Sequence, residues 1–77
     1  MIENAHVEMA MGSEGHRPVI RGTSIEVEAI LRMLSVGANM EEFLESYPSL
    51  KEKDIYGALS YSADIICWYE KQQGSGA

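Results

Sequence analysis

Apolar side chains recur at helical spacing in the segment 26–36, where a stripe at i, i+3, i+4 and i+7 predicts an amphipathic helix with one buried face. The stripe consists of Val27, Ile30, Leu31 and Leu34. Ser24 or Thr23 is in place to cap the start of this helix. Gly37 stands where a left-handed C-cap is expected, so the pattern predicts a helix that ends just before it.

A second, shorter helix is predicted over 40–46. Asn39 is a favourable N-cap, and Glu42 follows it three residues later, which is the spacing of a capping box. The helix is expected to end at Tyr47, because the residue before Pro48 is displaced from helical geometry. The residues expected to point inward are Phe43 and Leu44.

A third, longer helix is predicted over 51–71, with two apolar stripes on adjacent faces. The first stripe consists of Ile55, Leu59, Ser62, Ile66 and Tyr69, and the second of Tyr61, Ile65 and Trp68. Because a three-helix domain of this size cannot bury both, we expect the second stripe to be a subunit or partner interface. The alternative is that the N-terminal strands cover the second stripe. Cys67 is interpreted as a small buried apolar residue.

The segment before the helices reads as extended structure and turns. Apolar and polar residues roughly alternate over 6–11, which favours a strand, and the β-branched pair Val19 and Ile20 favours a second one. A turn signal lies between them at 12–15. A lone two-stranded element is marginal in water, so it is expected to lie on the helices or to pair with another subunit.

These patterns divide the chain into strands and turn over 1–24, three packed helices of helix-turn-helix type over 25–71, and a disordered tail over 72–77. The fold class is therefore mainly α, with a short N-terminal β-hairpin or strand pair.

Composition narrows the functions that this domain can have. Twelve acidic residues against six basic ones give a net charge of −6, which argues against strong non-specific nucleic-acid binding and suits a basic partner protein. The chain has 77 residues, and domains this small usually need a disulfide, a metal or a second subunit for stability. One cysteine excludes an internal disulfide, and no metal-ligand spacing is found, so we expect a homodimer or a permanent partner.

Catalytic chemistry is not indicated. Glu41, Glu42 and Glu45 read as a solvated helix face, and His6 and His16 are ten residues apart with no nucleophile nearby. We therefore expect a binding protein without a cofactor, not an enzyme. No signal-peptide pattern and no membrane-length apolar run is seen, so the protein is expected to be soluble and cytoplasmic.

The segment 15–25 reads Gly-His-Arg-Pro-Val-Ile-Arg-Gly-Thr-Ser-Ile and resembles the signature of a bacterial family, domain-of-unknown-function family 433. That family typically reads Gly-x-Pro-x-Ile-x-Gly-Thr-x-Ile. This motif is followed by an apolar helix with a glycine, then by a capped acidic helix that ends in Tyr-Pro. After these come Asp-Ile and a helix rich in small residues. The resemblance covers about 15–66 in order and spacing. The positions that carry it are Pro18, Ile20, Gly22, Thr23, Ile25, Leu31, Leu34, Gly37, Glu41, Glu42, Leu44, Tyr47, Pro48, Leu50, Asp54, Ile55, Ala58, Leu59 and Tyr61.

The resemblance implies a homeodomain-like or winged helix-turn-helix fold. It also implies a role like that of VapB-type antitoxins, which often pair with a PIN-like nuclease toxin. Two positions depart from the family pattern: Ser24 stands where arginine is common, and Ala-Met-Gly at 10–12 replaces an Asp-Pro start to the loop. The missing arginine weakens the expectation of nucleic-acid binding.

Candidate nucleic-acid contacts fall into two groups. Arg17 and Arg21 flank the turn before the first helix and can meet an anion or an acidic partner, or pair with the chain's own carboxylates. In a helix-turn-helix protein the start of the third helix would enter the major groove. Its exposed residues are expected to be Lys51, Lys53, Tyr56, Gly57 and Ser60. The lysines would reach phosphates, and the tyrosine or the serine would touch base edges.

The first hypothesis for function is an antitoxin-like regulatory protein that forms a homodimer and binds a toxin, with operator binding as a second activity. The alternatives are a stand-alone helix-turn-helix transcriptional regulator and an interaction module without a nucleic-acid role.

Overall fold

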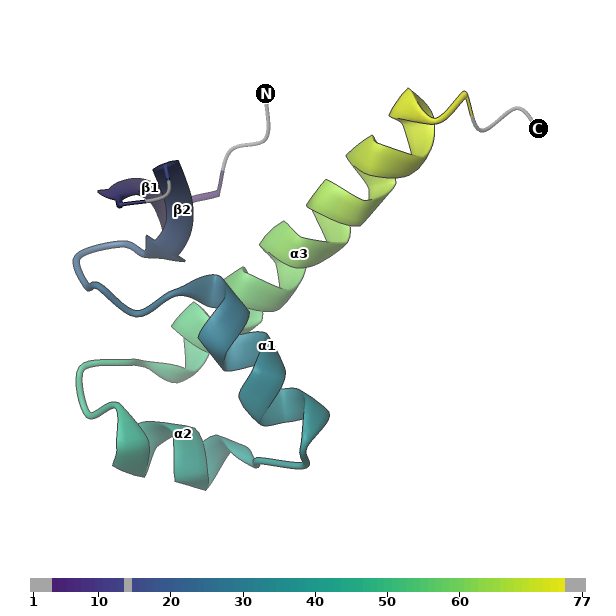
Figure 1. Ribbon diagram of the computed structural model, residues 1–77. Coiled ribbons are helices and arrows are strands. Elements are labelled where there is room, and N and C mark those ends of the chain that lie inside the picture. Colours follow the sequence, from purple (N-terminus) through teal and green to yellow (C-terminus); the bar gives the residue numbers. More distant parts are fainter. Residues whose placement is uncertain (1–3, 14, 75–77) are drawn as a thin grey trace.

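The computed structural model describes residues 4–13 and 15–74. Its elements follow the order β1 (Val7–Gly12), β2 (Gly15–Ile20), α1 (Val27–Ser35), α2 (Met40–Ser46) and α3 (Glu52–Gln72) (Figure 1). The chain is mainly helical, with three helices and a two-stranded antiparallel sheet, as its sequence predicts. Position 14 of the predicted turn and positions 75–77 of the predicted tail lie outside the described residues.

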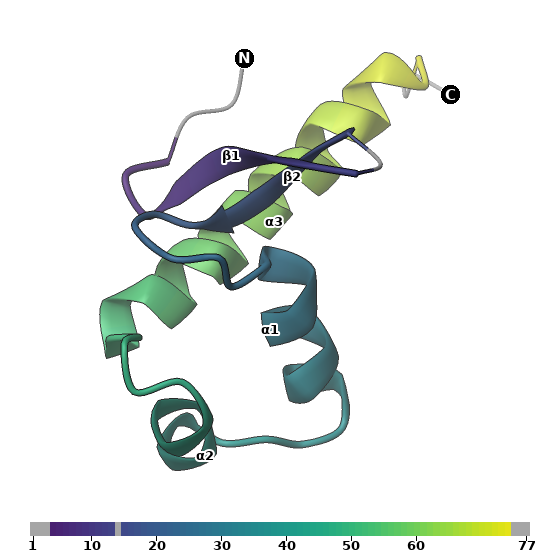
Figure 2. The ribbon, with the colours of Figure 1, turned by 60° about the vertical axis from the view of Figure 1, so that its left-hand side comes forward.

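The two strands pair with each other in a single hairpin, from Val7 opposite Ile20 at the base to Gly12 opposite Gly15 at the tip. Pairing is therefore within one chain. β2 is longer than its β-branched pair predicts, because cross-strand pairing continues through Pro18 to the turn. β1 lies against α3 and β2 against α1, so the hairpin rests on the helices (Figure 2).

The start of α1 differs from the prediction. Its N-cap residue is Glu26, without a side-chain capping hydrogen bond, so neither Ser24 nor Thr23 caps the helix. The Thr23 hydroxyl instead accepts a hydrogen bond from the Ile25 N–H over 3.0 Å and donates one to the Ile20 carbonyl over 2.8 Å. The threonine is used in the turn that folds the chain back onto β2, and it is not available to α1.

The link between α1 and α2 follows the signals in the sequence. Gly37 has a φ of 92°, and the N–H groups of Gly37 and Ala38 donate to the carbonyls of Leu34 and Met33, which is a Schellman motif. At the start of α2, the Glu42 N–H donates to Asn39 Oδ1 over 2.9 Å, and the Asn39 N–H donates to Glu42 Oε1 over 2.8 Å. Both the left-handed C-cap and the capping box are thus confirmed.

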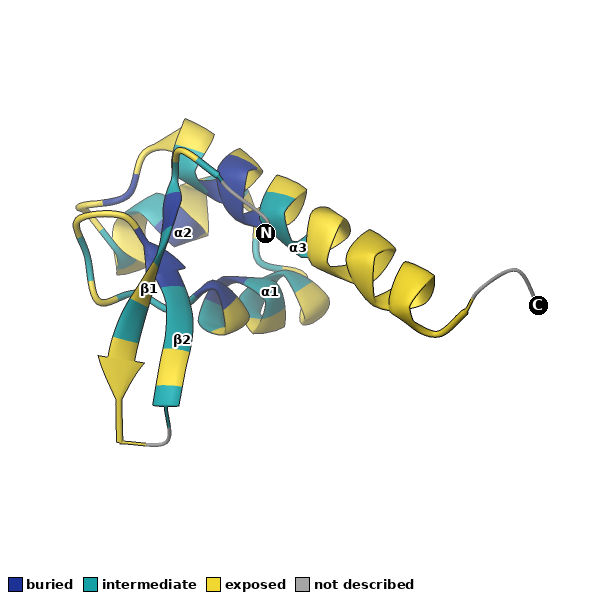
Figure 3. Cartoon of the chain, turned by 90° about the horizontal axis from the view of Figure 1, so that it is seen from above, coloured by how far each residue is buried: buried dark blue, intermediate teal, exposed yellow. Residues whose placement is uncertain are grey.

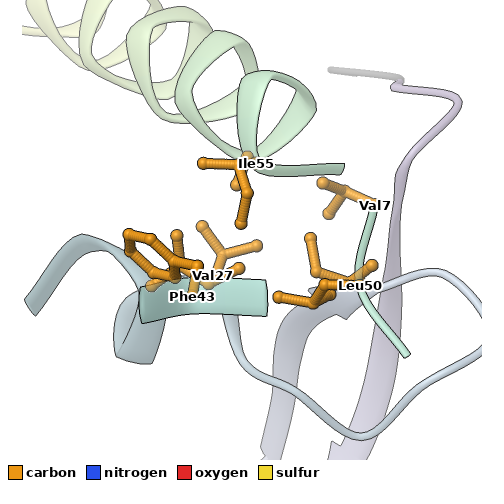
Figure 4. Packing of buried hydrophobic residues seen from close by; sticks show 8 residues of the cluster. Val7, Val27, Phe43, Leu50 and Ile55 are labelled. Atoms are coloured by element: carbon orange, nitrogen blue, oxygen red, sulfur yellow. The ribbon is translucent and has the colours of Figure 1, made fainter. Parts of the chain in front are cut away.

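The hydrophobic core lies where the base of the hairpin, α1, α2 and the first two turns of α3 meet (Figure 4). Its buried residues are Val7, Ile20, Val27, Ile30, Phe43, Leu50, Ile55 and Ala58. Leu31 and Leu34 of the predicted α1 stripe pack against this cluster, half-buried. Because Val7 and Ile20 belong to the same cluster as the helical residues, the hairpin is part of the domain core and not a separate layer.

Beyond Ser62, α3 leaves the core and every described residue on it is exposed (Figure 3). The expectation that the domain buries the first stripe is wrong here, since only Ile55 of that stripe is buried while Leu59, Ile66 and Tyr69 are exposed. The burial predicted for Cys67 is also wrong. The physical reason is length: α3 spans 21 residues and the core reaches only its first half. No helix among the described residues is long and apolar enough to cross a membrane.

Candidate interaction surfaces

The most prominent surface feature is a group of large apolar side chains on the second half of α3, here called the distal face. It consists of Ile65, Ile66, Trp68 and Tyr69, which are 37%, 59%, 50% and 57% exposed. Aromatic and branched aliphatic residues at this density are typical of the centre of a protein interface. A contiguous exposed patch of this kind marks an interaction site more often than it marks a free surface.

The distal face continues the face by which α3 packs on the core. Ala58, Ser62, Ile65 and Tyr69 follow one another at spacings of four, three and four residues, which keeps them on one side of a helix. Ala58 is fully buried, Ser62 is half-buried and the last two are exposed. Burial is lost along this face because the rest of the domain ends partway along the helix, while the sequence pattern continues unchanged.

The hairpin covers the near end of this surface only in part. The Tyr61 hydroxyl donates to Met9 Sδ over 3.9 Å, and Tyr61 is half-buried. Met9 itself is 54% exposed and Met11 is 71% exposed. The predicted interface residues Tyr61, Ile65 and Trp68 therefore lie along one line on α3. The strands partly cover Tyr61 and leave the other two exposed. Met9, an exposed methionine at the near end of the apolar surface, suits a binding surface because its side chain adapts to different partners.

Arg17 extends from β2 toward the start of α1. One guanidinium nitrogen lies 3.4 Å from Glu26 Oε1 and 3.5 Å from Glu28 Oε1. These carboxylates belong to a shallow hollow lined by Ser24, Ile25, Glu26, Glu28, Ala29, Arg32 and Tyr47. Arg17 thus pairs with carboxylates of its own chain. This is one of the two roles expected for it from the sequence, the other being contact with an anion or an acidic partner.

Arg21 holds the N-terminal segment to the turn that follows β2. Its Nε donates to the Ala5 carbonyl over 3.0 Å, and one terminal nitrogen donates to the Val7 carbonyl over 3.0 Å and to the Asn4 carbonyl over 3.4 Å. Glu8 Oε1 lies 3.6 Å from the other terminal nitrogen. This network was not evident from the sequence, because its carbonyl acceptors are backbone groups that carry no residue signature.

Four of the five residues expected to be exposed at the start of α3 are exposed. Lys51, Lys53, Tyr56 and Ser60 are exposed around the first half of the helix. Gly57 is an exception: it is buried, and the Asn4 side-chain amide donates to its carbonyl over 3.2 Å. The prediction that Gly57 is exposed is wrong because the segment before β1 docks on this turn of the helix.

His6 and Asp54 form a pair that joins distant parts of the chain. His6 Nδ1 lies 3.3 Å from Asp54 Oδ1, and Asp54 Oδ2 accepts the Lys51 N–H over 3.0 Å, so this pair ties the N-terminal segment to the start of α3. Glu41 and Glu45 are exposed to solvent. Within residues 4–13 and 15–74, no group of three His, Cys, Asp or Glu side chains is arranged to hold a metal ion.

Comparison with known protein families gives a match to part of the chain. The model of the family described as protein of unknown function (DUF433) matches residues 13–62. The matched segment runs from the tip of the hairpin to the middle of α3 and ends just before the distal face. No curated protein and no solved structure matches the chain.

Proposed function

The chain belongs to this family of proteins of unknown function, and from that premise we propose that it is an antitoxin-like regulatory protein that forms a homodimer and binds a toxin. The proposed toxin is a nuclease of the PIN-like class, and the proposed location is the cytoplasm. The exposed distal face of α3 is the observation that carries the proposal. A regulator that works by protein contact needs an apolar anchor surface, and a catalytic protein needs a reactive cleft instead.

Charge supports a protein partner over a nucleic acid. The chain carries a net charge of −6, which repels phosphate at long range and attracts a basic surface. Arg17 and Arg21 are occupied by intrachain carboxylates and carbonyls. Nucleases need basic surface to hold their substrates, so a strongly acidic small protein is well suited to cover such a surface.

The first test is whether the gene next to this chain's gene encodes a PIN-like nuclease, and the experiment is then co-expression of the two proteins. We expect a stable complex that copurifies and relief of the growth arrest caused by the nuclease alone. The double variant Ile65→Ala/Trp68→Ala is expected to lose the homodimer, and with it the complex or its stability, whereas Val36→Ala is expected to behave like the wild type. Val36 is a suitable control because it is 84% exposed and lies at the end of α1, away from the distal face. Growth arrest that persists beside abundant, folded wild-type protein would contradict the proposal.

A second candidate function is transcriptional regulation through a homeodomain-like or winged helix-turn-helix fold. Lys53, Tyr56 and Ser60 favour it, because all three are exposed on neighbouring positions of the first half of α3. Retarded migration of the chain's own upstream DNA, with affinity that falls steeply as salt rises, would support this function. If neither the nuclease nor this DNA binds, the remaining function is an interaction module without a nucleic-acid role.

A further inference from the structure

We propose that the distal face of α3 packs against the same face of a second copy, with the two helices antiparallel and Asp64 of each copy beside Lys71 of the other. This inference rests on the proposed self-association. It goes beyond that proposal because it fixes the surface, the direction of the helices and their register.

Residue spacing on α3 fits side-by-side packing of two helices. Ala58, Tyr61, Ile65, Trp68 and Gln72 alternate at intervals of three and four residues. This is the 3.5-residue average that keeps one seam of a helix facing a partner helix. In an antiparallel pair, Ile65 of each copy lies opposite Trp68 of the other. The segment over which the two helices pack then runs over 61–72 and is about 18 Å long at 1.5 Å per residue.

The position of the core decides the direction. In the first half of α3 the seam face is covered by the chain's own core, through Ile55 and Ala58. A parallel partner would bring its own core to the same side and the same end of the helix pair, where the first core already lies. An antiparallel partner places the two cores at opposite ends of the shared segment. Only the antiparallel arrangement therefore leaves room for both domains.

Charge then selects the register. Asp64 and Lys71 are exposed, stand seven residues apart, and each directly precedes a seam residue, so both lie on the same flank of the seam. In an antiparallel pair this flank of one helix lies next to the same flank of the other helix, which runs in the opposite direction. Asp64 of each copy therefore lies beside Lys71 of the other, so the symmetric dimer contains this ion pair twice. Within the described part of the chain, neither side chain forms an ion pair of its own. Both charges are thus available to a second copy.

The arrangement leaves the opposite side of the helix uncovered. Tyr56, Ser60 and Cys67 lie at spacings of four and seven residues on that side and are exposed. Dimerisation through the distal face would therefore not occlude the residues considered for contact with nucleic acid.

The test is sedimentation equilibrium of the full chain over a range of concentrations, with charge variants at these two positions. Asp64→Lys and Lys71→Asp each replace both ion pairs with like-charge pairs, and we expect each to raise the dimer dissociation constant about tenfold at low salt. The double variant Asp64→Lys/Lys71→Asp restores opposite charges and is expected to return to the wild-type value. Glu70→Lys changes the net charge by the same amount as Asp64→Lys but lies away from the seam, so it is the matched control for that variant and is expected to dimerise no more weakly than the wild type.

Mixing the two single variants gives a stricter test. In a mixed antiparallel pair, both lysines of one chain face both aspartates of the other, so the heterodimer is expected to form in preference to either homodimer. Thermal unfolding of each variant checks that the monomer is intact, since Asp64 and Lys71 are exposed on the half of α3 that lies beyond the core. A chain that stays monomeric at all concentrations, or a dimer that ignores the charge pattern, overturns this inference.

The outcome is separable from that of the proposed function. A monomeric chain that still neutralises the nuclease would overturn the antiparallel pairing and leave toxin binding in place. A charge-dependent dimer that does not bind the nuclease would overturn toxin binding and leave the pairing in place.

Discussion

Gly57 on α3 faces His6 so closely that a methyl group on the glycine would lie 2.5 Å from the His6 Cβ and 2.7 Å from its Cγ. The contact joins residues that are 51 positions apart in the sequence. Two hydrogen bonds lie next to it: the Asn4 side-chain amide donates to the Gly57 carbonyl, and His6 Nδ1 pairs with Asp54 Oδ1. Gly57 is therefore the position at which the N-terminal segment docks on the helix, and the absence of a side chain there is a requirement of packing.

Gly57→Ala is expected to destabilise the fold by about 1–2 kcal/mol, because overpacking costs more than the roughly 1 kcal/mol that alanine gains over glycine inside a helix. Urea unfolding followed by circular dichroism measures the difference. In a His6→Gly background the nearest atoms are gone, so the same substitution is expected to stabilise the protein. Ser60→Ala, on the exposed side of the same helix, is the control and is expected to be neutral or slightly stabilising. An equal effect of Gly57→Ala in both backgrounds would show that the clash with His6 is not its cause.

Arg21→Ala is expected to lower the unfolding free energy by about 1–2 kcal/mol, because three backbone carbonyls lose a charged donor. Arg32→Ala is the matched control, since among the described residues the Arg32 side chain pairs only with Glu28, one turn away on an exposed helix face. Its loss should cost about 0.3–0.5 kcal/mol. Thermal unfolding of both variants makes the comparison. If Arg21→Ala proves as mild as the control, the carbonyl network does not hold the N-terminal segment.

Asn39→Ala removes the acceptor of the capping box at α2, and we expect it to cost about 1 kcal/mol of stability. Ser49→Ala, in the exposed loop after α2, is the control and should change little. Chemical denaturation of the two variants under the same conditions gives the difference. Equal midpoints would mean that α2 is held by the packing of its apolar side chains and not by its capping box.

Phe43→Ala empties a fully buried site at the centre of the core and is expected to cost about 3–5 kcal/mol, enough to unfold much of a small domain. Trp68→Ala truncates a larger side chain but one that is half exposed, so the unfolding free energy of the monomer should change by only about 0.5 kcal/mol. The comparison must be made at dilutions where the chain is monomeric. A large loss of monomer stability from Trp68→Ala would mean that the distal face already packs within its own domain.

The sequence by itself determined the features that depend on neighbours a few residues away. The three helices lie within one or two residues of their predicted bounds, because periodicity, the Asn39–Glu42 capping box and the glycine after α1 all act locally. Family membership was also evident, since the signature runs in order along the chain. The predicted α1 caps failed because the Thr23 hydroxyl is used by a turn that faces β2.

Only the tertiary structure decided which apolar residues are covered. Periodicity places Ala58, Ile65 and Tyr69 on one side of α3, but it does not say where along that helix the domain ends. The contact of Gly57 with His6 and the grip of Arg21 on three carbonyls likewise depend on the path of the chain between distant residues. Because the core reaches only the first half of α3, the same side of the helix is core at Ala58 and exposed surface at Ile65 and Trp68.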